Sequence, residues 1–510
     1  MFELPAARSV ERNPSQEWLR ERALAVMPRI TVTEFGNLNY SAGVTARLKN
    51  STFFVADREI HQNRISSAEA TEWAALQDRY IADQDMILLE GYIGPDPELR
   101  TGARLYIEAI QPNIVGMQDQ LYFPVDGDWS PEFTVIYTPG LRVPGKPDDR
   151  LIIVDLDNWV TRVFGSDYFG ESKMGGLRMW NRLVYDHGGL ALHAGLKTFP
   201  AEAARSGSEE SMLIIGLSGT GKTTTTFRRQ LGSLPVQDDF VALMPGGTIY
   251  TTEAGCFAKT YGLDPDDEPT IYHGATRPDA WLENVAVDEN GKVDFFDTSH
   301  TANGRCTFPL SRIRHRDPLG VPPARYLLIL NRSDHVIPAV ARLNPQQIPA
   351  YFMLGETKGT SAGGAAEAGK SLRVPGTNPF FFDDDALQGN RLGGGLHTGG
   401  YRSASVHNPG GWGGVGDGSK KVTISVSSAI VQGIVEGTIE WEADGDFGYD
   451  VAASVPGVDD IELLQPRRLY ERQGRAEEYE SIVARLKKER VEYLNGFAGL
   501  DPTIREGLGG

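Results

Sequence analysis

The stretch Gly216-Leu217-Ser218-Gly219-Thr220-Gly221-Lys222-Thr223-Thr224 matches at every position the pattern of a glycine, four residues and Gly-Lys-[Ser/Thr]. It follows a short apolar run, residues 212–215, that predicts a buried strand, and residues 223–231 predict a helix. In such a loop, backbone N–H groups surround phosphate oxygens. The sequence therefore predicts a P-loop in which Lys222 reaches the β- and γ-phosphates and the Thr223 hydroxyl binds Mg²⁺.

The length and composition predict a soluble protein of two large lobes. The chain has 510 residues, 40% of them hydrophobic and 23% charged, and no apolar run approaches a membrane span. The N-terminus lacks the apolar core of a signal peptide, and two cysteines, Cys256 and Cys306, fit a reducing cytoplasm. The formal net charge of −18 argues against nucleic-acid binding. We therefore expect a cytoplasmic protein with neither nucleic acid nor membrane as partner, in which an anionic substrate meets a locally basic pocket.

Apolar runs and turn signals indicate how the lobes are built. Residues 1–200 are expected to form an N-terminal α/β lobe that contributes acceptor-binding residues, with strands at 86–89 and 151–154. Residues 201–510 are expected to form the nucleotide-binding lobe, with strands at 240–243 and 326–330. Glycine crowds residues 389–418 and predicts a loop, whereas apolar residues recur at helical spacing in 475–497 and predict an amphipathic surface helix.

Segments around the P-loop resemble, in order, the motifs of ATP-dependent phosphoenolpyruvate carboxykinase. The resemblance implies an α/β, two-lobed, P-loop carboxykinase-like fold with mixed sheets and an active-site cleft between the lobes. It is clear from about residue 40 to residue 350 and weak beyond. The similar segments are Thr45-Ala46-Arg47, Tyr168-Phe169-Gly170-Glu171-Ser172-Lys173, the P-loop, Gln237-Asp238-Asp239, Glu253-Ala254-Gly255-Cys256-Phe257-Ala258-Lys259-Thr260, Leu282-Glu283-Asn284-Val285 and Asn303-Gly304-Arg305-Cys306-Thr307-Phe308-Pro309.

Phosphoryl transfer requires that charge on the γ-phosphate oxygens be neutralised. Lys222 and Lys259 are the candidate cations, and the carboxylate pair Asp238 and Asp239 is placed to hold Mg²⁺ and its waters. Each of these residues, taken singly, is also compatible with a surface role. Their spacing behind a P-loop favours catalysis, and we assign them as catalytic together with Lys173 and Arg305.

Oxaloacetate and phosphoenolpyruvate carry carboxylates, which guanidinium groups bind at two points. Arg47 and Arg305 are the proposed clamps, because the residues that they resemble contact the carboxylated substrate in the family. The tyrosine that Tyr168 resembles lies beside that substrate. We therefore predict substrate binding by Arg47, Tyr168, Arg305 and Ser218.

The resemblance also implies a second divalent ion, usually Mn²⁺, held by a lysine, a histidine and an aspartate. His193 and Asp239 match two of these ligands, but the family's metal-binding lysine is the second of a Lys-Lys pair and this chain has Lys173-Met174. A thioether is a poor ligand for Mn²⁺ or Mg²⁺. Either Lys173 takes the ligand role or the second site is altered.

Two further segments depart from the family. The lid signature Gly-Thr-Glu is replaced by a longer glycine-rich stretch, residues 355–364, and the adenine-contacting region has Lys421 where the family has arginine. We predict nucleotide binding by residues 216–224 and Lys421, with ATP as the expected nucleotide and with GTP and pyrophosphate left open.

Three functions are compatible with these residues. The first is a carboxykinase that converts ATP and oxaloacetate to phosphoenolpyruvate, CO₂ and ADP. The second keeps the phosphoryl transfer without decarboxylation, as a kinase for another small molecule or a protein residue; Met174 and the altered lid favour it. The third, a silent nucleotide-binding regulator, is disfavoured because the phosphoryl-transfer residues are intact. The sequence does not specify the oligomeric state.

Overall fold

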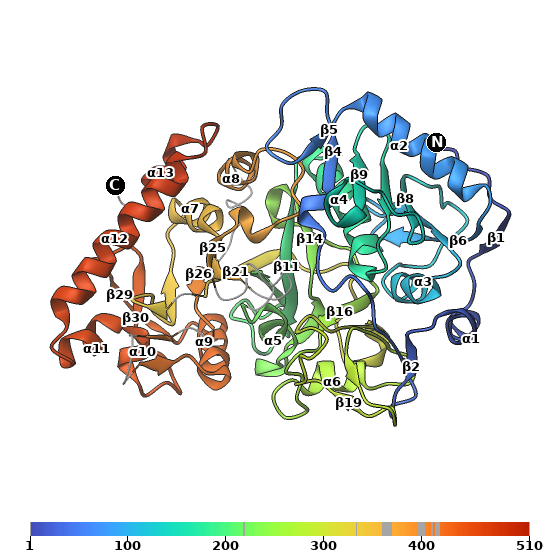
Figure 1. The fold of residues 1–510 in the computed structure, drawn as a ribbon. Helices are drawn as coiled ribbons and strands as arrows, with labels where there is room; N and C mark the ends of the chain where they lie inside the picture. The colour runs from blue at the N-terminus through green and yellow to red at the C-terminus, as the bar shows by residue number, and fades with distance from the viewer. Residues whose placement is uncertain are drawn as a thin grey trace.

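The computed structural model describes residues 2–508 except 218–219, 333, 360–369, 395–402, 410–411 and 414–418. Helices and strands are mixed throughout, and two large sheets lie side by side, one built by the N-terminal part of the chain and one by the middle and C-terminal parts (Figure 1). The predicted α/β fold class with mixed sheets is confirmed. The described part of the chain contains no helix with the length and apolar character of a membrane span.

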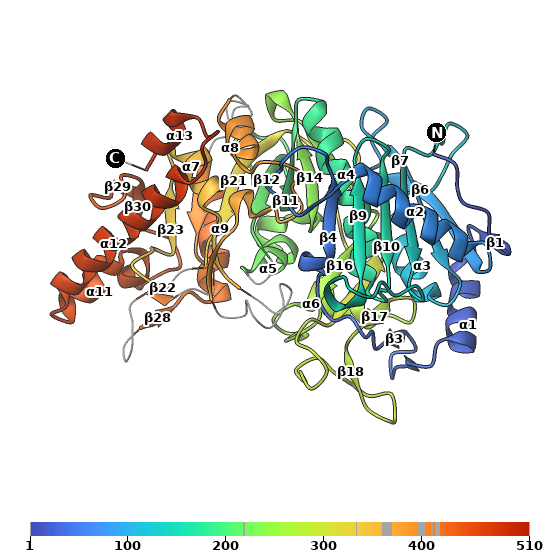
Figure 2. The ribbon, with the colours of Figure 1, turned by 45° about the horizontal axis from the view of Figure 1, so that its top comes forward.

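The first sheet has helices on both faces, because its strands alternate between two apolar layers. In β6, Met86 and Leu88 pack with Ile81 of α2 (Ser67–Ile81), whereas Ile87 and Leu89 join the main core with Leu177 of α4 (Phe169–Asp186). Figure 2 shows α2 lying across these strands. The order is β1 (Ser9–Arg12), β6 (Asp85–Ile93), β7 (Thr101–Glu108), β8 (Phe133–Thr138), β10 (Val160–Phe164), β9 (Leu151–Asp155), β4 (Thr52–Val55) and β5 (Arg64–Ile65).

The second sheet carries the P-loop at its centre. Its strand β12 pairs antiparallel with β11 and parallel with β21, and all six residues of β12 are buried. β11, which ends next to the predicted domain boundary at residue 200, belongs to this sheet and therefore lies with the nucleotide-binding part. The division of the chain into residues 1–200 and 201–510 stays a prediction. The order is β15 (Ile249–Thr251), β14 (Phe240–Leu243), β11 (Leu190–Phe199), β12 (Glu210–Ile215), β21 (Ala324–Leu330), β26 (Ser403–His407), β23 (Val340–Arg342), β30 (Asp450–Ser454) and β29 (Glu440–Ala443), with β13 (Leu234–Gln237) also paired to β11.

A smaller sheet joins the beginning of the chain to its middle. In it β3 (Leu38–Tyr40) pairs with β17 (Trp281–Glu283), so residues separated by more than two hundred positions become neighbours. The remaining strands are β16 (Gly255–Lys259), β20 (Arg305–Pro309) and β2 (Ile30–Val32). The pairing of β16 with β20 places Lys259 directly opposite Arg305.

The C-terminal part adds helices around one end of the second sheet, and α12 runs along the outside of the molecule (Figure 1). The remaining helices of four or more residues are α1 (Gln16–Val26), α3 (Pro112–Asp119), α5 (Lys222–Phe227), α6 (Pro269–Ala275), α7 (Gln347–Leu354), α8 (Ala386–Gly393), α9 (Ile424–Glu436), α10 (Ile461–Leu464), α11 (Pro466–Arg472), α12 (Ala476–Asn495) and α13 (Pro502–Glu506). Short strands complete the described chain: β18 (Ala286–Val287), β19 (Val293–Asp294), β22 (Asp334–His335), β24 (Glu356–Lys358), β25 (Ser371–Arg373), β27 (Trp412–Gly413) and β28 (Lys420–Lys421).

Most of the predicted elements are present, with two corrections. The strands at 86–89, 151–154, 212–215, 240–243 and 326–330 and the helix at 475–497 are confirmed, the last as α12. The helix after the P-loop ends at Phe227, and Leu231 has a φ of 53°, so it does not reach residue 231 as predicted. The loop predicted over 389–418 is wrong where the chain is described, because α8 and β26 occupy part of it and Leu392 is fully buried. Residues 395–402, 410–411 and 414–418 of that segment lie outside the described residues.

Candidate active site

A cavity of about 400 Å³ brings most of the predicted site residues together. The residues that line it include Arg47, Tyr168, Lys173, His193, Leu217, Gly221, Lys222, Thr223, Thr224, Asp238, Asp239, Lys259 and Arg305, together with Met174. Ser218 and Gly219 lie outside the described residues. Gly216 and Thr220 are buried, and Lys421 is exposed on β28; none of these three belongs to the lining as far as the chain is described. The role of Lys421 in nucleotide binding therefore stays a prediction.

Glycine is required at two points where the P-loop leaves β12. Gly221 has a φ of +87°, in the left-handed region that other residues rarely adopt. A Cβ on Gly216 would lie 2.5 Å from the Thr220 hydroxyl oxygen, which itself donates to the Leu217 carbonyl at 2.7 Å. The loop thus closes tightly, and Lys222 begins α5 with its side chain on the cavity.

The aspartate pair follows β13 and faces the start of α5. The Thr223 hydroxyl donates to Asp238 Oδ2 at 2.6 Å, while the buried Asp238 Oδ1 has no hydrogen-bond partner among the described residues. Burial raises the pKa of Asp238 to about 7. A buried carboxylate oxygen without a donor, next to a P-loop threonine hydroxyl, is suited to a hard cation such as Mg²⁺ and its waters.

Asp239 is the centre of a charged cluster. Its Oδ1 lies 2.9 Å from His193 Nε2 and 3.1 Å from Lys222 Nζ. His193 Nδ1 lies 2.9 Å from the Thr377 carbonyl, which can only accept, so Nδ1 is a donor there and Nε2 faces Asp239. An imidazole nitrogen beside a carboxylate oxygen is a donor pair that a divalent ion accepts, so the histidine and aspartate fit a metal site.

The third metal ligand implied by the resemblance, a lysine, is absent here because Met174 stands at its position. Lys173 Nζ lies 2.5 Å from Asp239 Oδ2 and 2.8 Å from Glu253 Oε1. Burial alone would lower the pKa of Lys173, but Asp239 and Glu253 outweigh it and the pKa is raised. Among the described residues, no group of three or more His, Cys, Asp or Glu side chains could hold a metal ion. A ligand role for Lys173 and an altered second site both stay predictions.

Cationic side chains gather at the part of the cavity lined by Arg47, Lys259 and Arg305. The Arg305 guanidinium lies over the Phe257 ring at 5.2 Å and donates to Asn303 Oδ1 at 2.9 Å, and Arg47 lies over the Phe380 ring at 5.4 Å. Burial, with Arg305 and Arg332 nearby, lowers the pKa of Lys259 to about 8. An acidic protein thus presents a local positive pocket, as expected for an anionic substrate.

Some residues around the cavity had no role assigned from the sequence. Glu253 and Asn303 stand inside segments that resemble the family, and that position was their only signal. Glu268 accepts from the Thr224 hydroxyl and lines the cavity, although nothing in its sequence surroundings indicated this contact. Asp167, one residue before Tyr168, was not singled out at all. The catalytic and binding roles predicted for the residues of this cavity stay predictions, supported by their geometry and by the resemblance to the family.

The strand, loop and helix around Lys222, and the cavity that they face, are those of a P-loop phosphotransferase. The family model described as phosphoenolpyruvate carboxykinase matches residues 8–461. A protein of Ruegeria pomeroyi named phosphoenolpyruvate carboxykinase (ATP) is 31% identical over 399 residues, which cover 75% of this chain and 72% of that protein. One of the same name from Aeropyrum pernix is 30% identical over 441 residues, covering 82% and 83%. The chain belongs to the phosphoenolpyruvate carboxykinase family.

Proposed function

We propose that this protein is an ATP-dependent phosphoenolpyruvate carboxykinase, which converts ATP and oxaloacetate to phosphoenolpyruvate, CO₂ and ADP. One observation carries the proposal: a single cavity is lined both by Lys222 and Thr223 of the P-loop and by the arginines Arg47 and Arg305. Residues suited to bind phosphate and residues suited to bind a carboxylate therefore line the same cavity. Phosphoryl transfer between a nucleotide and a small carboxylate requires this arrangement.

In this proposal, each group of side chains has a distinct task. The P-loop and Lys222 hold the phosphates, and Lys259 neutralises charge on the transferred group. Arg47 and Arg305 bind the carboxylated substrate beside Tyr168. The C–C bond to the departing CO₂ breaks, its electron pair forms the enolate of pyruvate, and the enolate oxygen attacks the γ-phosphorus as the bond to ADP breaks.

We assign the nucleotide's Mg²⁺ to Thr223 and Asp238, and a second divalent ion, Mn²⁺ in the family, to His193 and Asp239. A divalent ion bound there would stabilise negative charge on oxygen. Lys173 keeps Asp239 and Glu253 in place through its two ion pairs, and Met174 supplies only a weak sulfur donor to the same cavity. Met174, in place of the family's lysine, is thus the departure from the family that lies at the second metal site.

We also place the protein in the cytoplasm with small-molecule partners alone. Both cysteines are buried and unpaired, which suits a reducing compartment. Met174 and the altered lid were the grounds for a kinase with another acceptor, but phosphate-binding and carboxylate-binding residues on one cavity favour the carboxykinase.

Purified protein with labelled ATP, Mg²⁺ and Mn²⁺, assayed with and without oxaloacetate, tests the proposal. We expect phosphoenolpyruvate, CO₂ and ADP in equal amounts, and only when oxaloacetate is present. Lys222→Met should abolish the reaction with the fold intact, since one fixed contact to transition-state charge contributes about 3–4 kcal/mol. Lys488→Met, on the exposed face of α12, is the matched control. Phosphorylation of another acceptor without CO₂ would contradict the proposal, and normal turnover by Lys222→Met would contradict the P-loop assignment.

A further inference from the structure

The segment that carries Arg47 has no helix or strand of its own over residues 41–48. Side chains from other parts of the chain hold its backbone instead. The Ala42 N–H donates to Asn284 Oδ1 at 2.7 Å, the Leu48 N–H donates to Glu171 Oε1 at 2.8 Å, and Asn303 Nδ2 donates to the Thr45 carbonyl at 2.7 Å. The position of Arg47 therefore depends on side chains remote in sequence.

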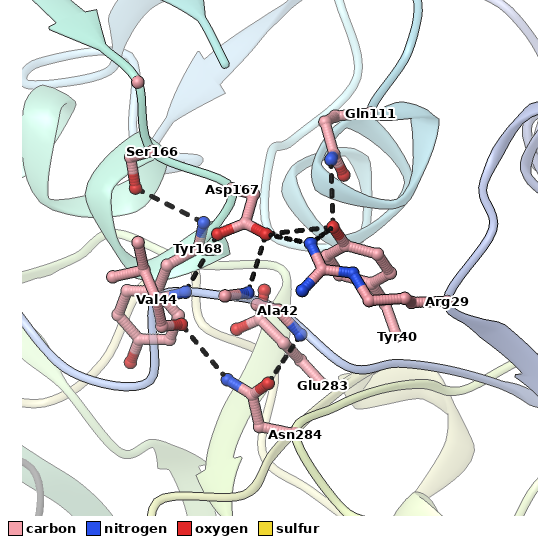
Figure 3. Close-up of polar contacts among 12 residues, drawn as sticks. Arg29, Tyr40, Ala42, Val44, Gln111, Ser166, Asp167, Tyr168, Glu283 and Asn284 are labelled. Carbon is pink, nitrogen blue, oxygen red and sulfur yellow. Dashed lines mark hydrogen bonds and ion pairs between the residues drawn. The ribbon is translucent and has the colours of Figure 1, made fainter. Parts of the chain in front are cut away.

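Asp167 and Asn284 each make two hydrogen bonds with this segment, and those of Asp167 go to two successive N–H groups. Asp167 Oδ2 accepts from the Gly43 N–H at 2.7 Å and its Oδ1 accepts from the Val44 N–H at 2.9 Å. Figure 3 shows the carboxylate between this segment and a second group of donors on its other side. There Oδ2 also accepts from Arg29 Nη2 at 2.8 Å and from the Tyr40 hydroxyl at 2.9 Å.

Asp167 is also covalently next to Tyr168, whose side chain is buried against the cavity. The backbone around Tyr168 is fixed in turn: its carbonyl accepts from the Tyr137 hydroxyl at 2.8 Å, and the next N–H, that of Phe169, donates to Glu283 Oε1 at 2.8 Å. A carboxylate attached to this fixed backbone and bonded to two successive N–H groups ties the Arg47 segment to the backbone of Tyr168, and Asn303 adds a second tie from the Thr45 carbonyl to the Tyr168 hydroxyl.

We propose that Asp167 is a positioning residue that holds the Arg47 segment against Tyr168 and so determines affinity for the carboxylated substrate. The inference rests on the proposed function, because that function makes Arg47 and Tyr168 substrate contacts. Asp167 itself is not part of the cavity lining among the described residues, so its effect passes through Arg47.

An aspartate is needed because donors approach both oxygens. In Asp167→Asn one of the two positions becomes an NH₂ group, which cannot accept. If the NH₂ faces Val44, that N–H loses its acceptor; if it faces Gly43, then Gly43, Arg29 and Tyr40 lose theirs. Either orientation releases the segment at one point without changing side-chain volume.

The test is Asp167→Asn, with Asp85→Asn as the control. Asp85 accepts three hydrogen bonds through its two oxygens, two from Arg8 and one from Ser9, against the four that Asp167 accepts, and it lies outside the cavity lining. For Asp167→Asn we expect the KM for oxaloacetate to rise about tenfold or more, since a misplaced contact of this kind costs up to about a hundredfold. The KM for ATP should stay within about twofold, and both constants should be unchanged in the control.

A double variant separates positioning from general destabilisation. If Asp167 acts through Arg47, adding Asp167→Asn to Arg47→Gln should raise the KM for oxaloacetate little further. Additive effects, equal changes in both KM values, or an unchanged KM in Asp167→Asn would each overturn the inference while leaving the carboxykinase function in place. Calorimetric binding of oxaloacetate provides a readout without turnover: a wild type that neither binds nor converts oxaloacetate overturns the function and this inference together.

Discussion

Replacing Arg490 with methionine should destabilise the protein by about 3 kcal/mol, because it breaks a buried ion pair from one side. Arg490 of α12 is 2% exposed and binds Glu356 at two points, Nε to Oε1 at 2.9 Å and Nη2 to Oε2 at 2.6 Å. Burial alone would raise the pKa of Glu356, but Arg490 and Arg373 lower it from an ordinary 4.5 to about 2. At 1.36 kcal/mol for each pH unit, that difference corresponds to about 3 kcal/mol.

The sign of the pH dependence follows from the lowered pKa. The contribution of Glu356 is complete above pH 4.5, where the carboxyl is ionised in both states, and is lost as the pH falls from 4.5 toward 2. The difference between wild type and Arg490→Met should therefore be largest at neutral pH and should shrink below pH 4.5.

Urea unfolding followed by circular dichroism at pH 7 and pH 3 measures the change. Arg485→Met is the control, since Arg485 is 65% exposed in its ion pair with Glu489 on the same helix. Hydrogen exchange should locate the loss at α12 and β24, where Glu356 precedes Thr357 and Lys358 of the cavity wall. An Arg490→Met midpoint equal to that of Arg485→Met, or a difference that grows in acid, would refute the reasoning.

Two further variants probe the substrate and metal contacts. Arg305→Gln should raise the KM for oxaloacetate by about tenfold or more with little change for ATP, because only the carboxylate loses a two-point partner; the exposed Arg312→Gln is the control, and equal losses for both ligands would move Arg305 to the nucleotide side. Met174→Lys should increase phosphoenolpyruvate formation at limiting Mn²⁺, because an amine nitrogen would join His193 and Asp239. Rates that do not respond to this substitution at any Mn²⁺ concentration would show that position 174 marks no change in the metal site.

The sequence predicted those parts of the site whose residues lie close together along the chain. Lys222, Thr223, Asp238 and Asp239 lie within a strand-loop-helix unit and the strand that follows it, so their spacing alone implied that they would meet. Residues 389–418 were read wrongly because glycine content lowers helix propensity, whereas α8 is stabilised by burying Leu392 in the core.

Contacts between distant segments were beyond sequence reasoning. Glu253 meets Lys173, and Asp167 meets the Arg47 segment, although each pair is far apart along the chain. Neither pairing has a local pattern from which it could be inferred. Resemblance predicts that Arg47 and Tyr168 bind the substrate, but the side chains that contact their segments had no motif to mark them.

Asp239 joins parts of the site that come from three different elements. Lys222 arrives from α5, His193 from β11 and Lys173 from α4, and each places a nitrogen within 3.1 Å of one of its oxygens. Because α4 packs on the first sheet while β11 belongs to the second, this carboxylate connects side chains from elements of both sheets. The ion pairs of Lys173 and Lys222 with Asp239 also offset part of the negative charge that a second metal would otherwise neutralise. The exchange of a lysine for Met174 is thus consistent with a site in which Lys173 supplies fixed positive charge and the divalent ion is held by fewer protein ligands.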